Sequence, residues 1–153
     1  MKSAFRYLAL AATLAFVPLS PARAAEANPW ASALGSSGAQ AVFTTYMSIA
    51  ELADLFGAKA YDKKKALQLA SMYEKLTEGA KESLTDLVSS GKLNKDDEAA
   101  VQQMVVINDL LGKTAKGITA YINDPTDENE QSYEKNRQKS WKALAKFLGI
   151  EDS

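Results

Sequence analysis

The stretch NKDDEAAVQQMVVINDLLGKTAKGITAYINDP, residues 94–125, decides the fold of this chain. Its apolar side chains recur every three or four positions, which places them on one face of a helix. Asn94 can accept hydrogen bonds from the free amides of the first turn, and acidic residues follow it where the helix dipole is positive. Pro125 disfavours helical geometry in the residue before it. The stretch therefore predicts a long helix with an apolar face formed by Val101, Met104, Val105, Leu111, Ala115, Ile118 and Ile122.

Three further segments show the same helical periodicity. Residues 37–57 end at Gly57 and residues 62–91 end at Gly91, where a glycine can cap the last turn. The final segment begins after Thr126 and ends at Gly149. Their predicted inner faces are, in order, Val42, Tyr46, Ile49, Ala53 and Phe56; Ala66, Leu69, Tyr73, Leu76, Ala80, Leu84 and Leu87; and Tyr133, Arg137, Trp141, Leu144 and Leu148.

These four amphipathic segments predict an all-α fold, an antiparallel four-helix bundle with up-down-up-down topology. No alternating run of Val, Ile or Thr bounded by turn residues predicts a strand. The bundle is expected to occupy residues 38–149, with a short C-terminal tail at 150–153. Residues 25–37, which are small, polar and broken by Pro29, are expected to form a flexible N-terminal tail. Its Trp30 either docks on the bundle, which the usual burial of tryptophan favours, or stays in solvent.

Residues 1–24 have the layout of a secretory signal peptide. Lys2 and Arg6 precede an apolar run that Pro18 interrupts well before the roughly 20 residues needed to span a bilayer. Ala22 and Ala24 then supply the small side chains of a cleavage site. We therefore expect a cleaved, exported chain located in the periplasm or outside the cell, with no stable membrane anchor after cleavage.

The charge of the predicted mature chain argues against nucleic acid as a partner. Cleavage removes three basic residues and no acidic one, which leaves 15 basic against 19 acidic residues and a net charge of −4. Affinity for nucleic acid or anionic lipid comes from basic residues that neutralise phosphates. The expected partner is instead a protein or small ligand whose identity the sequence does not give.

Several chemistries are excluded by missing residue types. The chain contains no histidine and no cysteine, so it lacks the usual ligands of zinc, copper and haem and the usual base of hydrolytic triads. A di-iron bundle needs Glu-x-x-His motifs, which this sequence cannot supply. The acidic turn at residues 123–134 has Asn129 where a calcium-binding EF-hand requires glycine. No cofactor, metal site or catalytic residue is predicted.

Four residues are candidates for ligand or partner binding. Arg137 is the only arginine of the predicted mature chain, and Tyr133 and Trp141 lie four positions before and after it on one helical face. A guanidinium on an inward face needs a carboxylate from a neighbouring helix or the anionic group of a ligand. Asn108 lies between Val105 and Leu111, so its amide is expected at or near the bundle seam or at its solvent-facing boundary.

The stretch ITAYINDPTDENEQSYEKNRQKSWKAL, residues 118–144, resembles part of the extracytoplasmic four-helix sensor modules of bacterial receptors. In those modules a polar turn joins two long helices, and a basic residue near the start of the second helix can meet a ligand. They are tethered by transmembrane helices at both ends, whereas this sequence shows no second apolar span. The resemblance implies a small helical binding scaffold.

Two functional hypotheses follow. The first is an exported, soluble helical-bundle protein that acts as a non-catalytic binding or accessory module of the cell envelope. The alternative is a small enzyme with a carboxylate- or tyrosine-based site between the helices. Binding is favoured because His and Cys, the commonest acid, base and nucleophile, are missing.

The leader assignment predicts that secretion leaves Ala25 as the amino terminus, because Ala22 and Ala24 fit the small-residue requirement of signal peptidase. N-terminal sequencing of the exported protein measures this. A start at Ala27 would move the cleavage site, and retention of the whole apolar run would show that residues 1–24 are not a cleaved leader.

Overall fold

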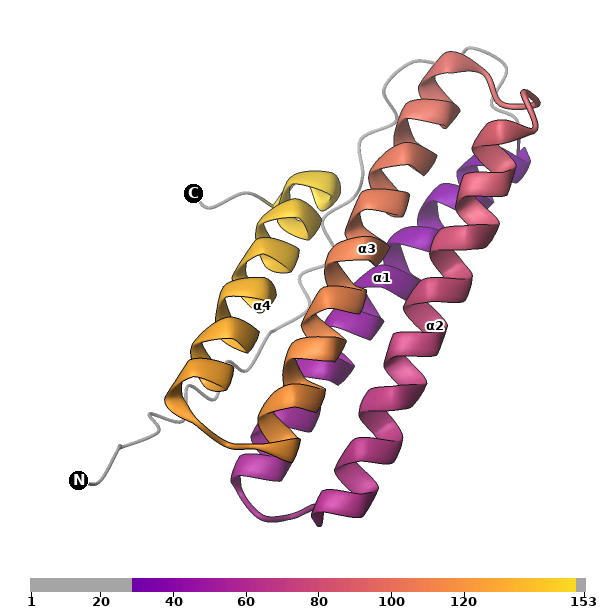
Figure 1. Cartoon of the computed structure of the whole chain (residues 1–153). Coiled ribbons are helices and arrows are strands. Elements are labelled where there is room, and N and C mark those ends of the chain that lie inside the picture. The colour runs from indigo at the N-terminus through magenta and orange to yellow at the C-terminus, as the bar shows by residue number, and fades with distance from the viewer. Residues whose placement is uncertain (1–28, 151–153) are drawn as a thin grey trace.

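The computed structural model describes residues 29–150, with side chains from residue 35 onward. Within this range the chain forms helices α1 (Pro29–Gly57), α2 (Lys63–Ser89), α3 (Lys95–Asn123) and α4 (Asp127–Leu148), and no strand. Each helix runs back toward the end at which the previous helix began (Figure 1). The predicted all-α architecture of four packed helices is confirmed.

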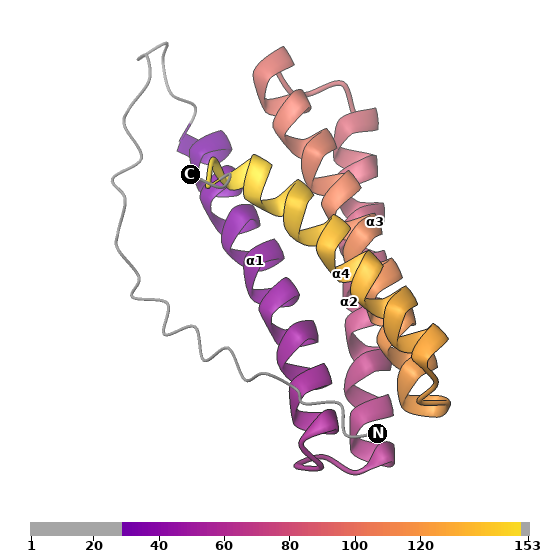
Figure 2. The same cartoon turned by 90° about the vertical axis from the view of Figure 1, so that its left-hand side faces the viewer.

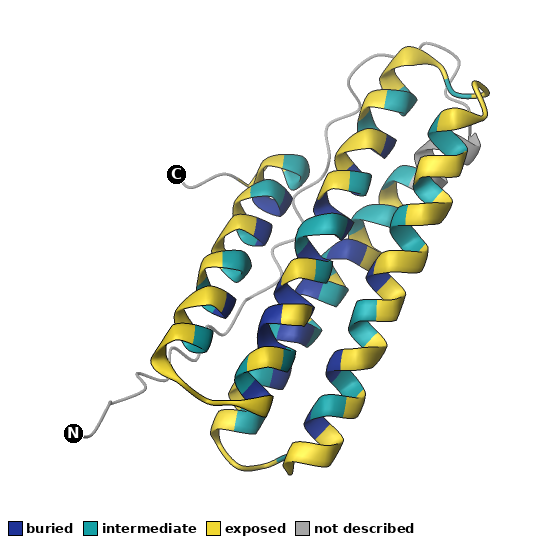
Figure 3. Cartoon of the chain, viewed as in Figure 1, coloured by how far each residue is buried: buried dark blue, intermediate teal, exposed yellow. Residues whose placement is uncertain are grey.

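Helix α3 lies at the centre of this arrangement. It packs against α1, α2 and α4, whereas the described parts of α2 and α4 do not contact each other. Figure 2 shows α4 crossing the other helices at a clear angle, so the four helices do not form a square bundle. Figure 3 shows the buried positions gathered on the inner faces, most densely along α3.

The caps of α3 and α4 match the sequence patterns. The Asn94 side chain accepts a hydrogen bond from the amide of Asp97, and the Thr126 hydroxyl accepts one from the amide of Asn129. Acidic residues occupy the first turn of both helices, where they complement the dipole. Gly149 ends α4 in the left-handed conformation that glycine adopts without steric cost.

Three details of the sequence prediction are wrong. Helix α1 begins at Pro29, so residues 29–37 are helical and are not a tail. Gly57 is the last residue of α1, and the left-handed residue that follows is Lys59, with φ of 60°. Leu76, assigned to the inner face of α2, is 56% exposed, and Thr77 is buried in its place.

Several predictions concern residues outside the described range. They are the signal peptide at 1–24, the start of the tail at 25–28, and most of the C-terminal tail at 151–153. The side chain of Trp30 is also outside the described set, so its docking stays a prediction. None of the described helices combines the length and apolar character needed to cross a membrane.

Small side chains let the neighbours of α3 approach closely. A Cβ atom added to Gly117 would lie 3.1 Å from the Tyr133 Cα atom of α4, and one added to Gly112 would lie 3.2 Å from the Thr77 hydroxyl of α2. Thr114 and Ser140, both buried, share a hydrogen bond of 2.8 Å between α3 and α4. The α3–α4 interface therefore combines backbone proximity with a satisfied polar pair.

This packing predicts opposite effects of alanine at two helical glycines. Gly79 has open space where its Cβ would lie, so Gly79→Ala should raise the free energy of unfolding by up to about 1 kcal/mol through helix propensity. Gly117→Ala should lower it by about 1–2 kcal/mol, because the new methyl group pushes α4 away from α3. Urea unfolding followed by circular dichroism measures both, and equal stabilisation by the two changes would contradict a close α3–α4 contact.

Candidate functional site

Arg137 sits on the part of α4 that faces α1 and forms three hydrogen bonds. Its Nε and Nη2 atoms donate to the two carboxylate oxygens of Glu134 at 2.7 Å each, and its Nη1 atom donates to the hydroxyl of Tyr46 in α1 at 2.8 Å. The carboxylate partner thus belongs to the same helix, three residues earlier, and not to a neighbouring helix as expected. The fork geometry of the guanidinium is what allows both carboxylate oxygens to bind at once.

Tyr46 connects this ion pair to an aromatic contact. Its ring lies 5.3 Å from the ring of Trp141, measured between centroids, at an interplanar angle of 36°. Burial raises the pKa of Tyr46, although the nearby Arg137 charge acts in the opposite direction. The phenol therefore stays protonated at neutral pH and accepts a hydrogen bond from Arg137. We call Tyr46, Glu134, Arg137 and Trp141 the arginine cluster.

Tyr133 lies next to the arginine cluster and, like Tyr46, belongs to the core. Its side chain is buried, and its hydroxyl is the one buried side-chain N or O atom in the described part of the chain without a hydrogen-bond partner. Burial raises the pKa of this phenol strongly, so it has no tendency to ionise near neutral pH. A tyrosine in that state cannot serve as a nucleophile or base.

Asn108 is buried as the sequence suggested, but it is not part of the arginine cluster. Its amide nitrogen donates to the Met104 carbonyl oxygen one turn earlier in α3, at 2.9 Å. The hydrogen bond therefore stays within one helix, and this donor fixes no register between helices. Of the four candidate residues, the structure brings together Tyr133, Arg137 and Trp141, and it leaves Asn108 apart.

The charges of the arginine cluster compensate each other. The hydrogen bonds from Arg137 hold the pKa of Glu134 below its usual range, so the pair is ionised at neutral pH. Both side chains are partly exposed, at 33% for Arg137 and 40% for Glu134. Part of the guanidinium fork remains for a further acceptor, because only three of its five N–H groups are used. A role of Arg137 as a ligand anchor stays a prediction.

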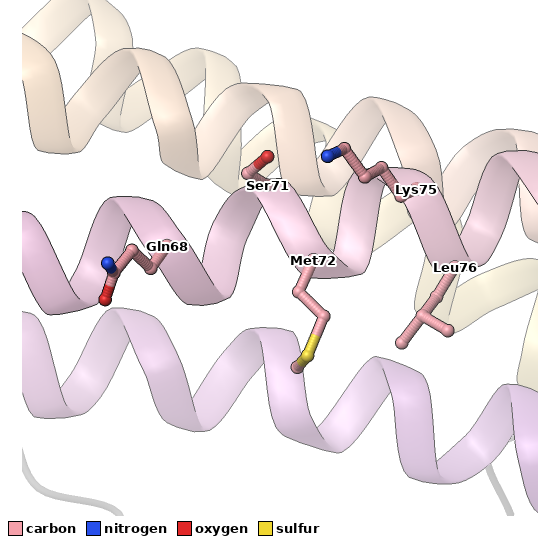
Figure 4. Close-up of a pocket in the computed structure, with 5 residues that line it drawn as sticks. All are labelled: Gln68, Ser71, Met72, Lys75 and Leu76. Carbon is pink, nitrogen blue, oxygen red and sulfur yellow. The ribbon is translucent and has the colours of Figure 1, made fainter.

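Two hollows of the described surface lie elsewhere, one between α1 and α2 and one beside it on α2 alone. One has a volume of about 450 Å³ and the other about 370 Å³, and Leu76 lines both. Met72 and Leu76 extend from α2 toward α1 (Figure 4). We call this surface the α1–α2 groove; its lining residues are Ser37, Gln40, Ala41, Thr44, Thr45 and Ser48 of α1 and Gln68, Ser71, Met72, Tyr73, Lys75 and Leu76 of α2.

The α1–α2 groove was missed because Leu76 fits the apolar periodicity of α2. The signal that could have revealed it is in α1, where residues 27–50 contain no charged residue. A helix exposed on one face normally carries charged residues there. The uncharged run therefore indicates a face that differs from an ordinary solvated surface.

Among the described residues, no group of three or more acidic side chains is placed to hold a metal ion. Comparison of the chain with protein-family models, with curated proteins and with solved structures finds no match. The function must therefore be argued from the geometry of the arginine cluster and of the α1–α2 groove.

The arginine cluster predicts energetic coupling between α1 and α4. Tyr46→Phe should lower the free energy of unfolding by about 1 kcal/mol because it removes the acceptor of Arg137. Arg137→Met should lower the free energy of unfolding by a similar amount, since the partly exposed ion pair contributes little stability by itself. In the double variant the loss of unfolding free energy should be smaller than the sum of the two single losses by at least about 0.5 kcal/mol. A coupling of roughly 0.5–3 kcal/mol is typical of residues in contact.

Denaturant unfolding of the four proteins in this cycle measures the coupling. Lys135→Met, at an exposed position of the same helix, is the matched control and should stay within about 0.5 kcal/mol of the parent. Arg137→Lys should lose most of the coupling because one ammonium group cannot bind the carboxylate and the phenol in the same geometry. Strict additivity of Tyr46→Phe and Arg137→Met would contradict the contact.

Proposed function

We propose that the chain is an exported, soluble and non-catalytic binding or accessory module of the cell envelope, and that it binds its partner through the α1–α2 groove. The observation that carries this proposal is the pairing of two open hollows with exposed apolar side chains at one place. The leader-like residues 1–24 support export, and the absence of His and Cys disfavours catalysis.

The chemistry of the groove suits a protein segment better than a small molecule. Small-molecule sites enclose most of their ligand and direct a few polar groups at it, whereas the α1–α2 groove is open to solvent. Its α1 side offers hydroxyl and amide groups, and its α2 side offers Met72 and Leu76, which are 43% and 56% exposed. Methionine adapts its shape to a partner surface at low cost. An amphipathic helix fits such a surface.

The alternative of a tyrosine- or carboxylate-based enzyme receives less support. Burial raises the pKa of Tyr133, and Arg137 lowers the pKa of Glu134, so neither group is adjusted toward neutral pH. Efficient acid–base catalysis needs a pKa near the working pH. The two hollows also lie on α1 and α2, away from the arginine cluster of α1 and α4.

Site-directed photo-crosslinking tests the binding role. Leu76 and Val106 are both 56% exposed, but only Leu76 lines the groove, so a photoreactive phenylalanine at each position forms a matched pair. We expect one discrete adduct from position 76 in cells that make the protein, none from position 106, and loss of the adduct when Thr44→Lys places a charge in the groove. Equal adducts from both positions, or none from position 76, would contradict the proposal.

A further inference from the structure

Helix α1 presents an exposed face without charge. Gln40, Thr44 and Met47 follow one another at helical spacing and are all exposed. No Asp, Glu, Lys or Arg occurs among residues 27–50, and none of the other described helices has an uncharged run of comparable length. On the opposite side of α1, Val42, Tyr46 and Ile49 are buried. The uncharged face is therefore solvent-facing and continuous over more than two turns.

The neighbouring surface of α2 extends this face with apolar side chains. Leu76 lies beside Thr44 in the same hollow, and Met72 lies one turn earlier in α2. Lys75 is the charged residue of the lining, and its side chain points away from α1 in Figure 4. Of the five exposed large apolar residues in the described chain, Met47, Met72 and Leu76 belong to α1 and α2. The groove and the uncharged face form one surface.

We propose that this surface binds a second copy of the chain, with the two α1 helices antiparallel about a two-fold axis near Thr44. The inference rests on the proposed binding role of the groove and names the partner. A two-fold contact requires a self-complementary patch, and a symmetric axis at Thr44 brings Leu76 of each copy toward its counterpart. The dimer then buries the exposed apolar side chains of both copies.

Charge favours a second copy at this face. The predicted mature chain carries a net charge of −4, so two copies repel each other wherever acidic surfaces meet, and the uncharged run of α1 avoids this repulsion.

The size of the surface agrees with a weak, concentration-dependent dimer. Its lining in α1 extends from Ser37 to Ser48, about 18 Å of helix, and two adjacent helices packed at about 8–10 Å present a face about 20 Å wide. The projected area of about 360 Å² lies below the ~800 Å² per partner of a standard interface and is typical of a transient contact.

Sedimentation velocity over a range of concentrations tests the proposal, with the chain purified after expression together with its own leader. We expect a species of twice the monomer mass. Thr44→Glu should weaken dimerisation at least 100-fold because two carboxylates meet at the axis, whereas Val106→Glu, at an exposed site outside the groove, should leave the dimer intact. Circular dichroism of both variants verifies that the helices remain folded.

A cysteine variant provides a second readout, because the chain has no cysteine of its own. Under mild oxidation Thr44→Cys should give a disulfide-linked dimer that retains the parent sedimentation, and Val106→Cys should not. A monomer at every concentration, or a dimer that persists in Thr44→Glu, overturns the proposal. If the chain is monomeric while position 76 still crosslinks to a different protein, the binding role stands and only the self-association fails; if no adduct forms either, both fail.

Discussion

The fold depends on the burial of one helix by three others. Helix α3 contacts α1, α2 and α4, so apolar side chains must cover more than one of its faces, and its buried residues are spread over nearly its whole length. Close packing also needs small residues at the contacts. In α3 these are Gly112, which faces α2, and Gly117, which faces α4. Polar residues at such positions must form hydrogen bonds, as the pair Thr114 and Ser140 does. The contact surfaces of α3 therefore determine where the other three helices pack.

Helix α1 is attached differently from α2 and α4. Its core residues Val42, Ile49 and Leu52 face inward, but its contact with α4 relies on the hydrogen bond between Tyr46 and Arg137 and on the adjacent Tyr46–Trp141 ring contact. Its contact with α2 is sparse and leaves the two hollows of the groove. On the outer side of α1, the exposed residues from Gln40 to Met47 carry no charge. The sparse α1–α2 contact is therefore what leaves the α1–α2 groove exposed.

The sequence predicts the helices well because their signals are local. The caps at Asn94 and Thr126 and the stop at Gly149 depend only on residues a few positions away. The partners of side chains across the interior are not local, and here the prediction failed in a specific way. Arg137 was expected to need a carboxylate from another helix or the anionic group of a ligand. Its partner is instead Glu134, three residues earlier on the same helix, which accepts hydrogen bonds from the Nε and Nη2 atoms. Periodicity likewise assigned Leu76 to the core, because it cannot show that no neighbouring helix covers this position, where the side chain is 56% exposed.

The two candidate sites differ in how their polar groups are used, and this difference bears on function. In the arginine cluster the charge of Arg137 is matched by Glu134 and the phenol of Tyr46 accepts one of its hydrogen bonds, so a ligand would find an already neutralised charge and only the two remaining N–H groups. In the α1–α2 groove the hydroxyl and amide groups of α1 border exposed apolar side chains of α2. Met72 and Leu76 are exposed in the chain, so covering them would be favourable through the hydrophobic effect. The neighbouring Thr44 and Gln40 could exchange hydrogen bonds with water for hydrogen bonds with polar groups of a partner. Arg137 thus joins α4 to α1 through Tyr46, whereas the α1–α2 groove exposes apolar side chains that no neighbouring helix covers.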